Sequence, residues 1–337
     1  MKEHPVAAAA FFAATGLFAA AALFAAPACA HAVYTVFDVP QATATFPAAI
    51  NNTKSVTGAY RDGAGRLHGF VRNNKGRFWT FDPDGSTETH PVAIDDDGDV
   101  AGWFKRNGKT FAFMRFAGGR TFMLKPPPGK IAAATAIDNA GDVAGTVIVA
   151  GRSQGFLRGA TGLFAEFDAP GAHDTFPTHM NNSAAIVGYS ADEDNPDQHH
   201  GFIRVDADTL TSFDVAGAIA TDPAFIGDDG AVAGSYADAD GLVHGFVRAP
   251  NGAISTFDVP GAASTMPVGI DDRGALYGSW IAPDMHIHGF QHRSDGTVIK
   301  FDVPGASDTL VDAVNLRGVT TGLATQSGVT HGFLRTR

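Results

Sequence analysis

Apolar and polar positions alternate over short distances along most of the chain. Outside the N-terminus, few stretches show the 3.6-residue spacing of apolar positions that an amphipathic helix requires. Turn formers such as "INN", "IDDDGD" and "IDDRG" separate the apolar runs, and their Asn, Asp and Gly residues tolerate left-handed backbone conformations. The pattern predicts many short strands joined by tight turns.

One unit of this pattern recurs seven times, with a period of 43 to 46 residues. The units begin at Phe37, Phe81, Leu124, Phe167, Phe213, Phe257 and Phe301. In every unit an apolar residue follows 13 positions later, and a glycine eight positions after that. These glycines are Gly58, Gly102, Gly145, Gly188, Gly234, Gly278 and Gly322. A shared position without a side chain indicates that another backbone approaches closely there.

Each unit predicts four short strands. The first ends near the apolar residue, the second carries "VxG", the third carries "HGFxR" and the fourth carries "xTFD". Four strands in about 45 residues, repeated along the chain, is the pattern of a β-propeller. We therefore predict an all-β fold, a seven-bladed β-propeller of four-stranded blades that occupies residues 31–337 as a single domain.

The two ends of the repeat region complement each other. Residues 34–38, "YTVFD", are a fourth strand without the three strands before it, and the chain finishes with "THGFLRTR", a third strand without a fourth. Pairing residues 34–38 with residues 331–335 completes the last blade and removes an unpaired edge. The sequence predicts a ring closed by the N-terminal strand.

A histidine and an aspartate bracket the last two strands of most units. They lie 14 positions apart in His68 and Asp82, His200 and Asp214, His244 and Asp258, and His288 and Asp302. Three-residue loops with glycine third, such as "NKG" at residues 74–76, predict a hairpin with a type I turn and a left-handed glycine between them. In such a hairpin the two side chains face each other, with Cβ atoms roughly 5 Å apart.

The exceptions also indicate a contact between the two side chains. In the second unit Phe111 and Lys125 replace both members together. In the last unit His331 meets Asp38 only if the ring closes. A catalytic pair is needed once, so a pair in nearly every unit is best explained as scaffold, in which the carboxylate fixes the imidazole tautomer. Recruitment of one unit's pair for chemistry is the alternative.

The units contain "AINNxxxVTGxYxDxxGxxHGFVR" followed by "FDVPGA". These motifs resemble the HAF-type extracellular repeats of bacterial proteins, and the resemblance covers nearly all of residues 34–337. The "HGF" of this chain departs from the alanine that is usual at the middle position. The resemblance implies an exported β-propeller and carries over no catalytic residue.

The N-terminus predicts export. An apolar run over residues 6–26 follows a basic residue and precedes "ACA" at residues 28–30. This is the pattern of a secretory signal peptide over residues 1–30, cleaved after Ala30, which predicts a secreted or periplasmic protein without a membrane span after cleavage. The run is also long enough for an uncleaved anchor. Cys29 is the only cysteine; it leaves a lipid anchor open, and the mature chain has neither a disulfide nor a cysteine nucleophile.

Composition limits the classes of partner that the protein is expected to bind. The chain has 337 residues, 45% of them hydrophobic, and a net charge of −11. This length and apolar content suffice for a large core. An acidic surface without basic runs argues against nucleic acid and anionic membranes as partners. No cofactor is evident, although the charge is compatible with a divalent cation such as calcium, and we expect a monomer that contacts an extracellular glycan or protein.

If the repeated residues build the scaffold, function is expected where one unit differs from the others. His179 replaces a small residue of the first strand, which is expected to line the channel, and His173 and Asp174 precede it. A carboxylate and two imidazoles near one axis can bind a metal or act as acid and base. These three residues are the catalytic candidates, and exposed loop residues are the alternative interpretation.

Other non-repeating residues are candidates for binding. They lie in or just before a first strand, or after the glycine of a second strand, where an aromatic ring can stack on a sugar or pack between blades: Glu88, His90, Asp222, Asp308, Asp312, Trp103 and Trp280. Asp192, Asp194 and Asp197 in the loop at residues 191–200 are calcium candidates, but their spacing is not that of an EF-hand and a solvated loop is the simpler interpretation.

The sequence thus favours a binding or interaction module for a glycan or surface protein over an enzyme. A propeller-type polysaccharide lyase or hydrolase, with a histidine and carboxylate site at the channel mouth, is the chief alternative. A structural surface protein without a small ligand is the third. The fold cannot choose between them, because propellers host binding proteins and enzymes alike.

Overall fold

The computed structural model describes residues 32–128 and 130–336. These residues form 28 strands and no helix, so the predicted all-β class is confirmed for the described chain. The predicted signal peptide over residues 1–30 lies outside the described residues. Among the residues that the structure describes, no helix has the length and hydropathy needed to cross a membrane.

The strands form four-stranded antiparallel sheets, which we number in chain order. Sheets 1, 2 and 3 comprise β2–β5, β6–β9 and β10–β13. Sheets 4, 5 and 6 comprise β14–β17, β18–β21 and β22–β25, and single parallel pairs at His199 and Ala220 and at Val243 and Ser264 join them into one larger sheet. Sheet 7 comprises β26–β28 and β1.

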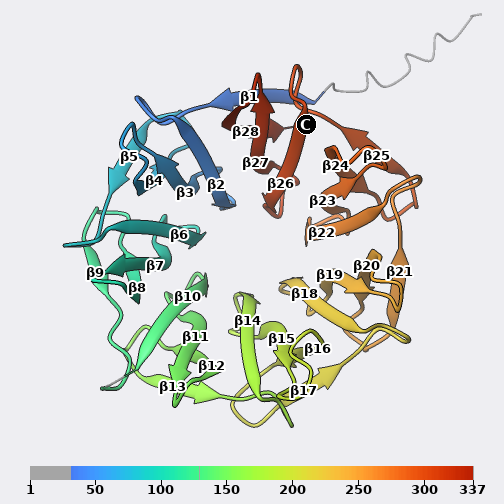
Figure 1. Cartoon of the computed structure of the whole chain (residues 1–337), viewed down its shortest axis with the longest axis horizontal. Coiled ribbons are helices and arrows are strands. Elements are labelled where there is room, and N and C mark those ends of the chain that lie inside the picture. The colour runs from blue at the N-terminus through green and yellow to red at the C-terminus, as the bar shows by residue number, and fades with distance from the viewer. Residues whose placement is uncertain (1–31, 129, 337) are drawn as a thin grey trace, which may run out of the picture. The chain divides into compact units, whose positions relative to one another are not determined.

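The sheets stand around a common axis, with the first strand of each sheet nearest the centre and the fourth at the periphery (Figure 1). The first strands are β2 (Ala44–Ile50), β6 (Glu88–Ile94), β10 (Ile131–Ile137), β14 (Asp174–Met180), β18 (Ala220–Ile226), β22 (Ser264–Ile270) and β26 (Asp308–Val314). The second strands are β3 (Val56–Arg61), β7 (Val100–Arg106), β11 (Val143–Val149), β15 (Ile186–Ala191), β19 (Val232–Ala237), β23 (Leu276–Ile281) and β27 (Thr320–Gln326).

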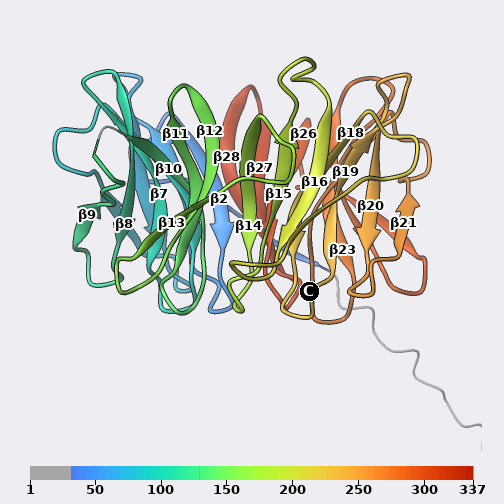
Figure 2. The same ribbon diagram turned by 90° about the horizontal axis from the view of Figure 1, so that it is seen from below.

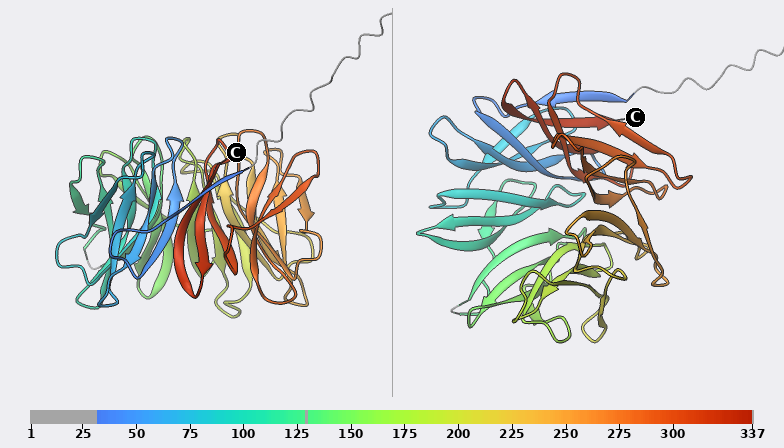
Figure 3. Two further views of the ribbon diagram at one scale, coloured as in Figure 1. Left: turned by 90° about the horizontal axis from the view of Figure 1, so that it is seen from above. Right: turned by 45° about the vertical axis from the view of Figure 1, so that its right-hand side comes forward.

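The third strands are β4 (Leu67–Arg72), β8 (Lys109–Arg115), β12 (Arg152–Arg158), β16 (His199–Arg204), β20 (Val243–Arg248), β24 (Ile287–His292) and β28 (Val329–Thr336). The fourth strands are β5 (Phe78–Phe81), β9 (Thr121–Met123), β13 (Phe164–Phe167), β17 (Leu210–Phe213), β21 (Ile254–Phe257), β25 (Val298–Phe301) and β1 (Val33–Phe37). Seen from the side, the strands run between two faces that carry the connecting loops (Figure 2, Figure 3). We call the turns between first and second strands the inner turns, and the face that carries them the turn face.

The N-terminal strand belongs to the last sheet. β1 pairs antiparallel with β28, with Val33 opposite Thr336 and Phe37 opposite Gly332. The sequence placed residues 34–38 beside residues 331–335, which agrees with this register. The first and last described strands therefore complete one sheet.

The phenylalanines of the repeat fill the spaces between neighbouring sheets. The phenylalanine of "HGF" is fully buried in every sheet, as in Phe70 and Phe113. Phe81, at the end of β5 in sheet 1, packs edge-on against Phe113 of sheet 2, with ring centroids 5.8 Å apart. The guanidinium of Arg115 lies 5.0 Å from the centroid of the Phe81 ring. Apolar and cation-π contacts thus join one sheet to the next.

The shared glycine of each second strand lies opposite a β-bulge in the first strand. In sheet 1 the register shifts between Pro47 and Ala49, directly opposite Gly58. A Cβ atom on Gly58 would overlap the carbonyl oxygen of Phe46 and the Cα of Pro47. The close backbone approach predicted from the sequence is present, and it comes from the bulged strand of the same sheet.

Replacing Gly58 by alanine is expected to lower the free energy of unfolding by about 1–3 kcal/mol, because the added methyl group meets backbone atoms that cannot move aside. Urea denaturation of the variant measures the effect. Gly63→Ala is the matched control, because Gly63 is exposed and an added Cβ atom would meet nothing within 4 Å. Equal stability of the two variants would contradict this role of the bulge.

Candidate functional site

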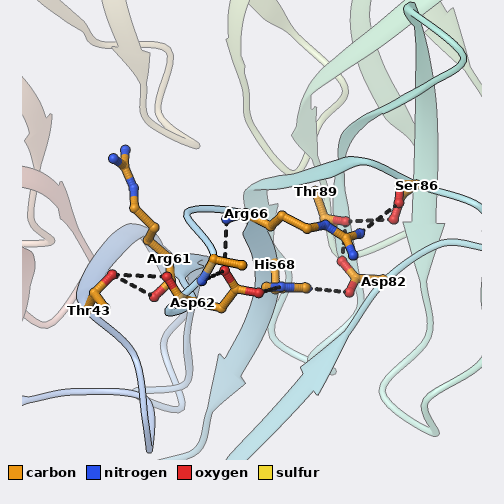
Figure 4. A network of polar contacts seen from close by, with 9 residues as sticks. Thr43, Arg61, Asp62, Arg66, His68, Asp82, Ser86 and Thr89 are labelled. Carbon is orange, nitrogen blue, oxygen red and sulfur yellow. Dashed lines mark hydrogen bonds and ion pairs between the residues drawn. The ribbon is translucent and has the colours of Figure 1, made fainter.

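The histidine and aspartate of each bracket are in direct contact. His68 Nδ1 lies 2.6 Å from Asp82 Oδ2, and its Nε2 lies 3.0 Å from Asp62 Oδ2, so two carboxylates hold one imidazole (Figure 4). The hairpin between them has the predicted form, since Gly76 has φ 81° and donates its N–H to Asn73 O at 2.9 Å. The register of this hairpin brings the pair together.

The same contact recurs in other sheets. The pairs that involve histidine Nδ1 are His200 with Asp214, His244 with Asp258, His288 with Asp302, and His331 with Asp38, at 2.7–3.0 Å. In sheet 3, Gln154 Nε2 donates to Asp168 Oδ2 at 2.7 Å. Phe111 of sheet 2 instead packs against Phe104, with ring centroids 5.5 Å apart. We call the face that carries these contacts the pair face.

A buried threonine extends the contact to the next sheet. Thr89, in the first strand of sheet 2, donates its hydroxyl proton to Asp82 Oδ1, and Thr45 does the same to Asp38 Oδ1 at 3.1 Å. Thr45 Oγ1 also accepts the backbone N–H of Val39 at 3.2 Å. The aspartate therefore joins the third strand of one sheet to the first strand of the next.

The carboxylates change the proton affinity of these imidazoles. Partial burial lowers the pKa of His68, but the hydrogen bonds to Asp82 and Asp62 outweigh burial and leave the pKa raised. The pKa of Asp62 is lowered, first through its hydrogen bond with His68. A charged imidazole between two carboxylates is thus favoured in the folded state.

The structure does not bring the three catalytic candidates together, so the predicted polar centre of His173, Asp174 and His179 is wrong. His173 Nδ1 lies 2.8 Å from Asp174 Oδ2 at the pair-face end of β14. His179 lies five residues further along an extended strand, which separates it from Asp174 by roughly 16 Å. It lines the channel near the turn face instead.

His179 is neutral in this position, and its ring accepts a hydrogen bond. Burial lowers its pKa to about 4. The backbone N–H of Ile226 lies 3.4 Å from Nδ1, which places the ring proton on Nε2. Its ring packs against Phe225, with centroids 4.6 Å apart. His179 therefore does not act as an acid–base partner of His173.

Asp312 is a buried carboxyl group in the channel wall. It lines a cavity of about 240 Å³ formed by the first strands, together with Thr135 and His179. Among the described residues nothing donates a hydrogen bond to its buried Oδ2 atom. Burial raises the pKa of Asp312 to about 7. A carboxyl group buried without a hydrogen-bond donor is expected to cost stability, and more so once it ionises.

Three binding candidates meet at the pair face in sheet 2. The His90 ring lies parallel to the Trp103 ring, at 12° and a centroid distance of 3.8 Å. His90 Nε2 lies 3.2 Å from Glu88 Oε2, and Lys105 Nζ lies 3.2 Å from the same oxygen. The Glu88 side chain is 36% exposed. Burial lowers the pKa of His90, so its imidazole is neutral at pH 7.

A second cluster at the pair face contains Asp222. His199 Nδ1 of sheet 4 lies 2.8 Å from Asp222 Oδ1 of sheet 5. The His199 ring stacks on Tyr189 at 4.4 Å, and Tyr189 stacks on Phe176 at 5.0 Å. Phe176 and His199 escaped the sequence candidates, whereas Tyr189 is one of the aromatic residues after a shared glycine that are expected to stack on a sugar or pack between blades. The Phe176–Tyr189 and Tyr189–His199 contacts join β14, β15 and β16, so they become visible only when the register of these strands is known.

Two other binding candidates, Asp308 and Trp280, are in contact with other residues of the protein. Asp308 Oδ1 lies 3.1 Å from His286 Nδ1 and accepts the backbone N–H of Ile287 at 3.2 Å. Trp280 is 8% exposed, because His288 stacks on its ring and Lys300 Nζ lies 4.1 Å from the ring centroid. Trp280 therefore packs within the protein, and a ligand contact of Asp308 stays a prediction.

The calcium candidates remain dispersed. Asp192 Oδ2 lies 3.6 Å from His200 Nε2. Within residues 32–128 and 130–336, no three histidine, cysteine or acidic side chains are arranged to hold a metal ion. Asp194 and Asp197 lie in the same connection between β15 and β16. A calcium site in this loop stays a prediction without a formed coordination shell.

The His68 contact predicts a pH-dependent stability difference. Its folded pKa is raised, so its ionic contribution is complete below the unfolded histidine pKa of about 6.5 and is lost as the pH rises through the folded pKa. His68→Gln keeps a neutral donor, as Gln154 does naturally in sheet 3. The melting temperature of the wild type should exceed that of His68→Gln most at pH 5.5 and least at pH 9. A difference independent of pH would contradict the ionic contribution.

Asp312 also predicts a loss of stability as the pH rises, but here the wild-type side chain is the destabilising one. Because its pKa rises from 3.8 to about 7 on folding, stability falls as the pH rises between these values. Asp312→Ala, which copies the alanine at positions 48 and 224, is expected to raise the free energy of unfolding by about 1–3 kcal/mol at pH 8 and to leave it unchanged near pH 3.5. Asp308→Ala, on the same strand, is the control and should destabilise. A less stable Asp312→Ala at pH 8 would refute the assignment.

Comparison with known proteins identifies the architecture. No family model matches the chain, and no curated protein matches its sequence significantly. One similar solved structure is a streptogramin B lyase, with 14% sequence identity and a TM-score of 0.61; the match covers 90% of this chain and 97% of that one. Another is virginiamycin B lyase from Staphylococcus aureus, with 14% identity and a TM-score of 0.60; the match covers 91% of this chain and 100% of that one. The β-propeller domain of the Trilobed protease from Pyrococcus furiosus is also similar, with 9% sequence identity and a TM-score of 0.59; the match covers 86% of this chain and 95% of that one. At these identities the likeness concerns the fold alone, which is of the propeller type.

Proposed function

We propose that the protein is an exported, seven-bladed β-propeller, closed by the pairing of β1 with β28, that binds a neutral glycan at the pair face. Seven four-stranded sheets, one for each sequence repeat, support the blade count. The register of β1 on β28 and the contact of His331 with Asp38 support the closure. The signal-like N-terminus supports export to the periplasm or beyond.

One observation carries the binding role: aromatic rings stacked on imidazoles, each beside a carboxylate, occur at non-repeating positions of the pair face. One cluster is Trp103, His90 and Glu88, and the other is Tyr189, His199 and Asp222. His90 and Asp222 occupy the third position of their first strands, the innermost strands of the fold. Flat rings with adjacent hydrogen-bonding carboxylates suit the apolar and hydroxyl surfaces of a sugar.

Charge favours a neutral glycan over an acidic one. The net charge of −11 repels uronic acids and sulfated sugars at long range. The carboxylates of Glu88 and Asp222 can accept hydrogen bonds from the neutral hydroxyls of a sugar.

A lyase is the second candidate, favoured by the likeness to two lyases over nearly the full length of each. His90 is neutral at pH 7 and lies beside Glu88, which suits a general base. A lyase must convert its ligand into a product, whereas a binding module leaves the ligand unchanged.

The test is calorimetric titration of the mature chain with soluble β-glucan, xylan and mannan. Trp103→Ala is expected to weaken binding roughly 3- to 10-fold, the loss of one aromatic stack. Trp79→Ala is the matched control, because Trp79 is 37% exposed on the peripheral strand β5 and should leave binding unchanged.

The outcomes separate the candidates. Saturable binding without new reducing ends or unsaturated product supports the module, and product formation that Glu88→Gln and His90→Gln abolish supports the lyase. No binding of any of the three polysaccharides at millimolar sugar concentration would count against the proposed site.

A further inference from the structure

Hydrogen bonds on the turn face run from sheet to sheet through the inner turns. In one kind, the side-chain amide of the first turn residue donates to the backbone of the next turn, as Asn51 Nδ2 does to Asp95 O at 2.7 Å. In the other, the backbone N–H of the second turn residue donates to a side-chain oxygen of the next turn, as Asn52 does to Asp96 Oδ1 at 2.8 Å. We call these bonds the turn belt. Such bonds link sheets 1 to 5 in succession and sheet 7 to sheet 1, and a backbone bond links sheets 6 and 7.

The turn belt is interrupted between sheets 5 and 6. Gly227 stands where the other inner turns have Asn or Asp, so it lacks the side chain for the first kind of bond. Asp228 accepts both of its side-chain hydrogen bonds from Asn182 of sheet 4. Within residues 130–336, no hydrogen bond joins Asp228 to Asp272, the corresponding residue of sheet 6. Like charges on these two carboxylates also oppose a closer approach.

A cavity of about 400 Å³ opens at this interruption. Its apolar walls come from both sheets, with Phe225 and Val247 on one side and Ile270 and Leu276 on the other. Phe225 is itself a departure from the repeat, since the same position holds alanine in four other sheets. The volume lies in the range of small-molecule pockets, about 300–1,000 Å³.

The rim of the cavity is acidic and has no local counter-charge. Asp228, Asp229 and Asp272 line it and are exposed. All of its lining residues lie in the described part of the chain, and none of them is a lysine or an arginine. Asp271 lines it as well, but its carboxylate accepts hydrogen bonds from the Ala275 N–H and the Tyr277 hydroxyl. The charge available to a ligand therefore comes from the exposed rim.

We propose that this cavity binds an organic cation: an apolar body between Phe225 and the Ile270 and Leu276 side chains, with an ammonium or guanidinium group at Asp228 and Asp272. Apolar walls select against a small hydrated metal ion, and the acidic rim selects against neutral and anionic ligands. The Phe225 ring offers a further contact for the cationic group. The site lies on the turn face and is independent of the glycan site on the pair face.

Calorimetric titration with 2-phenylethylamine tests the charge requirement, and 2-phenylethanol is the matched neutral probe. The amine is expected to bind saturably and roughly 3- to 10-fold more tightly than the alcohol at low salt, with the difference reduced at high ionic strength. Asp272→Asn should reduce amine binding to the level of the alcohol. Asp240→Asn is the control, since Asp240 is exposed on the pair face and should not affect either probe.

A competition experiment distinguishes the two possible sources of the cation, a partner protein and a free amine. A blocked tripeptide with a central arginine that competes with 2-phenylethylamine indicates a side chain of a partner protein, and failure to compete indicates a free amine. In both cases the same cavity must be used, so Asp272→Asn has to weaken the ligand that binds.

Gly227→Asn tests the cavity itself. It introduces the side-chain amide that links the inner turns of sheets 1, 4 and 7 to their neighbours, and its Cβ meets only the movable Asp229 carboxylate at short range. The variant is expected to raise the melting temperature and to abolish binding of the amine. Equal affinity for the amine and the alcohol, binding unaffected by Asp272→Asn, or a response to Ca²⁺ that displaces the amine would each overturn the proposal.

Discussion

Most sheets are tied to the next at the point where the chain passes from a peripheral strand to an innermost strand, and sheet 2, with Phe111 and Lys125 in place of the pair, is the exception. The aspartate at that crossing accepts a hydrogen bond from the histidine of the sheet just completed, as in sheets 7 and 1, and a threonine of the entering first strand donates to it. The phenylalanine before the aspartate packs into the following sheet. Because the crossing is short and closely bonded, the relative position of neighbouring sheets is fixed. The junction accounts for the repeated histidine, aspartate and threonine, while the shared glycine is accounted for by the bulge within each sheet.

The strongly periodic features were predictable from the sequence. The shared glycine, the "HGF" phenylalanine and the 14-residue spacing of His68 and Asp82 repeat, and a repeat can be converted into register. The buried threonine partner was not recognised, although Thr89 and its equivalents also repeat, because its contact crosses from one sheet to the next. The grouping of His173 with His179 failed because closeness in sequence along an extended strand means separation in space.

The irregular features carry the candidate sites, and they divide between the two faces. Stacked rings with carboxylates lie at the pair face, where first strands begin, and the apolar cavity lies at the turn face, where Gly227 interrupts the turn belt. Sequence alone could flag Gly227 as a departure but could not show what its missing side chain leaves open. That consequence depends on bonds made by the other turns, such as that of Asn51 to Asp95.

The pairing of β1 with β28 also bears on the order of assembly. Asp38 and His331, which meet beside this pair of strands, are separated by 293 positions in the sequence. The other six sheets consist of consecutive strands and can form from local contacts, whereas sheet 7 needs segments from opposite ends of the described chain. Contacts between distant segments tend to form slowly, so we expect sheet 7 to be completed last, with the edge of β28 open to other chains until then.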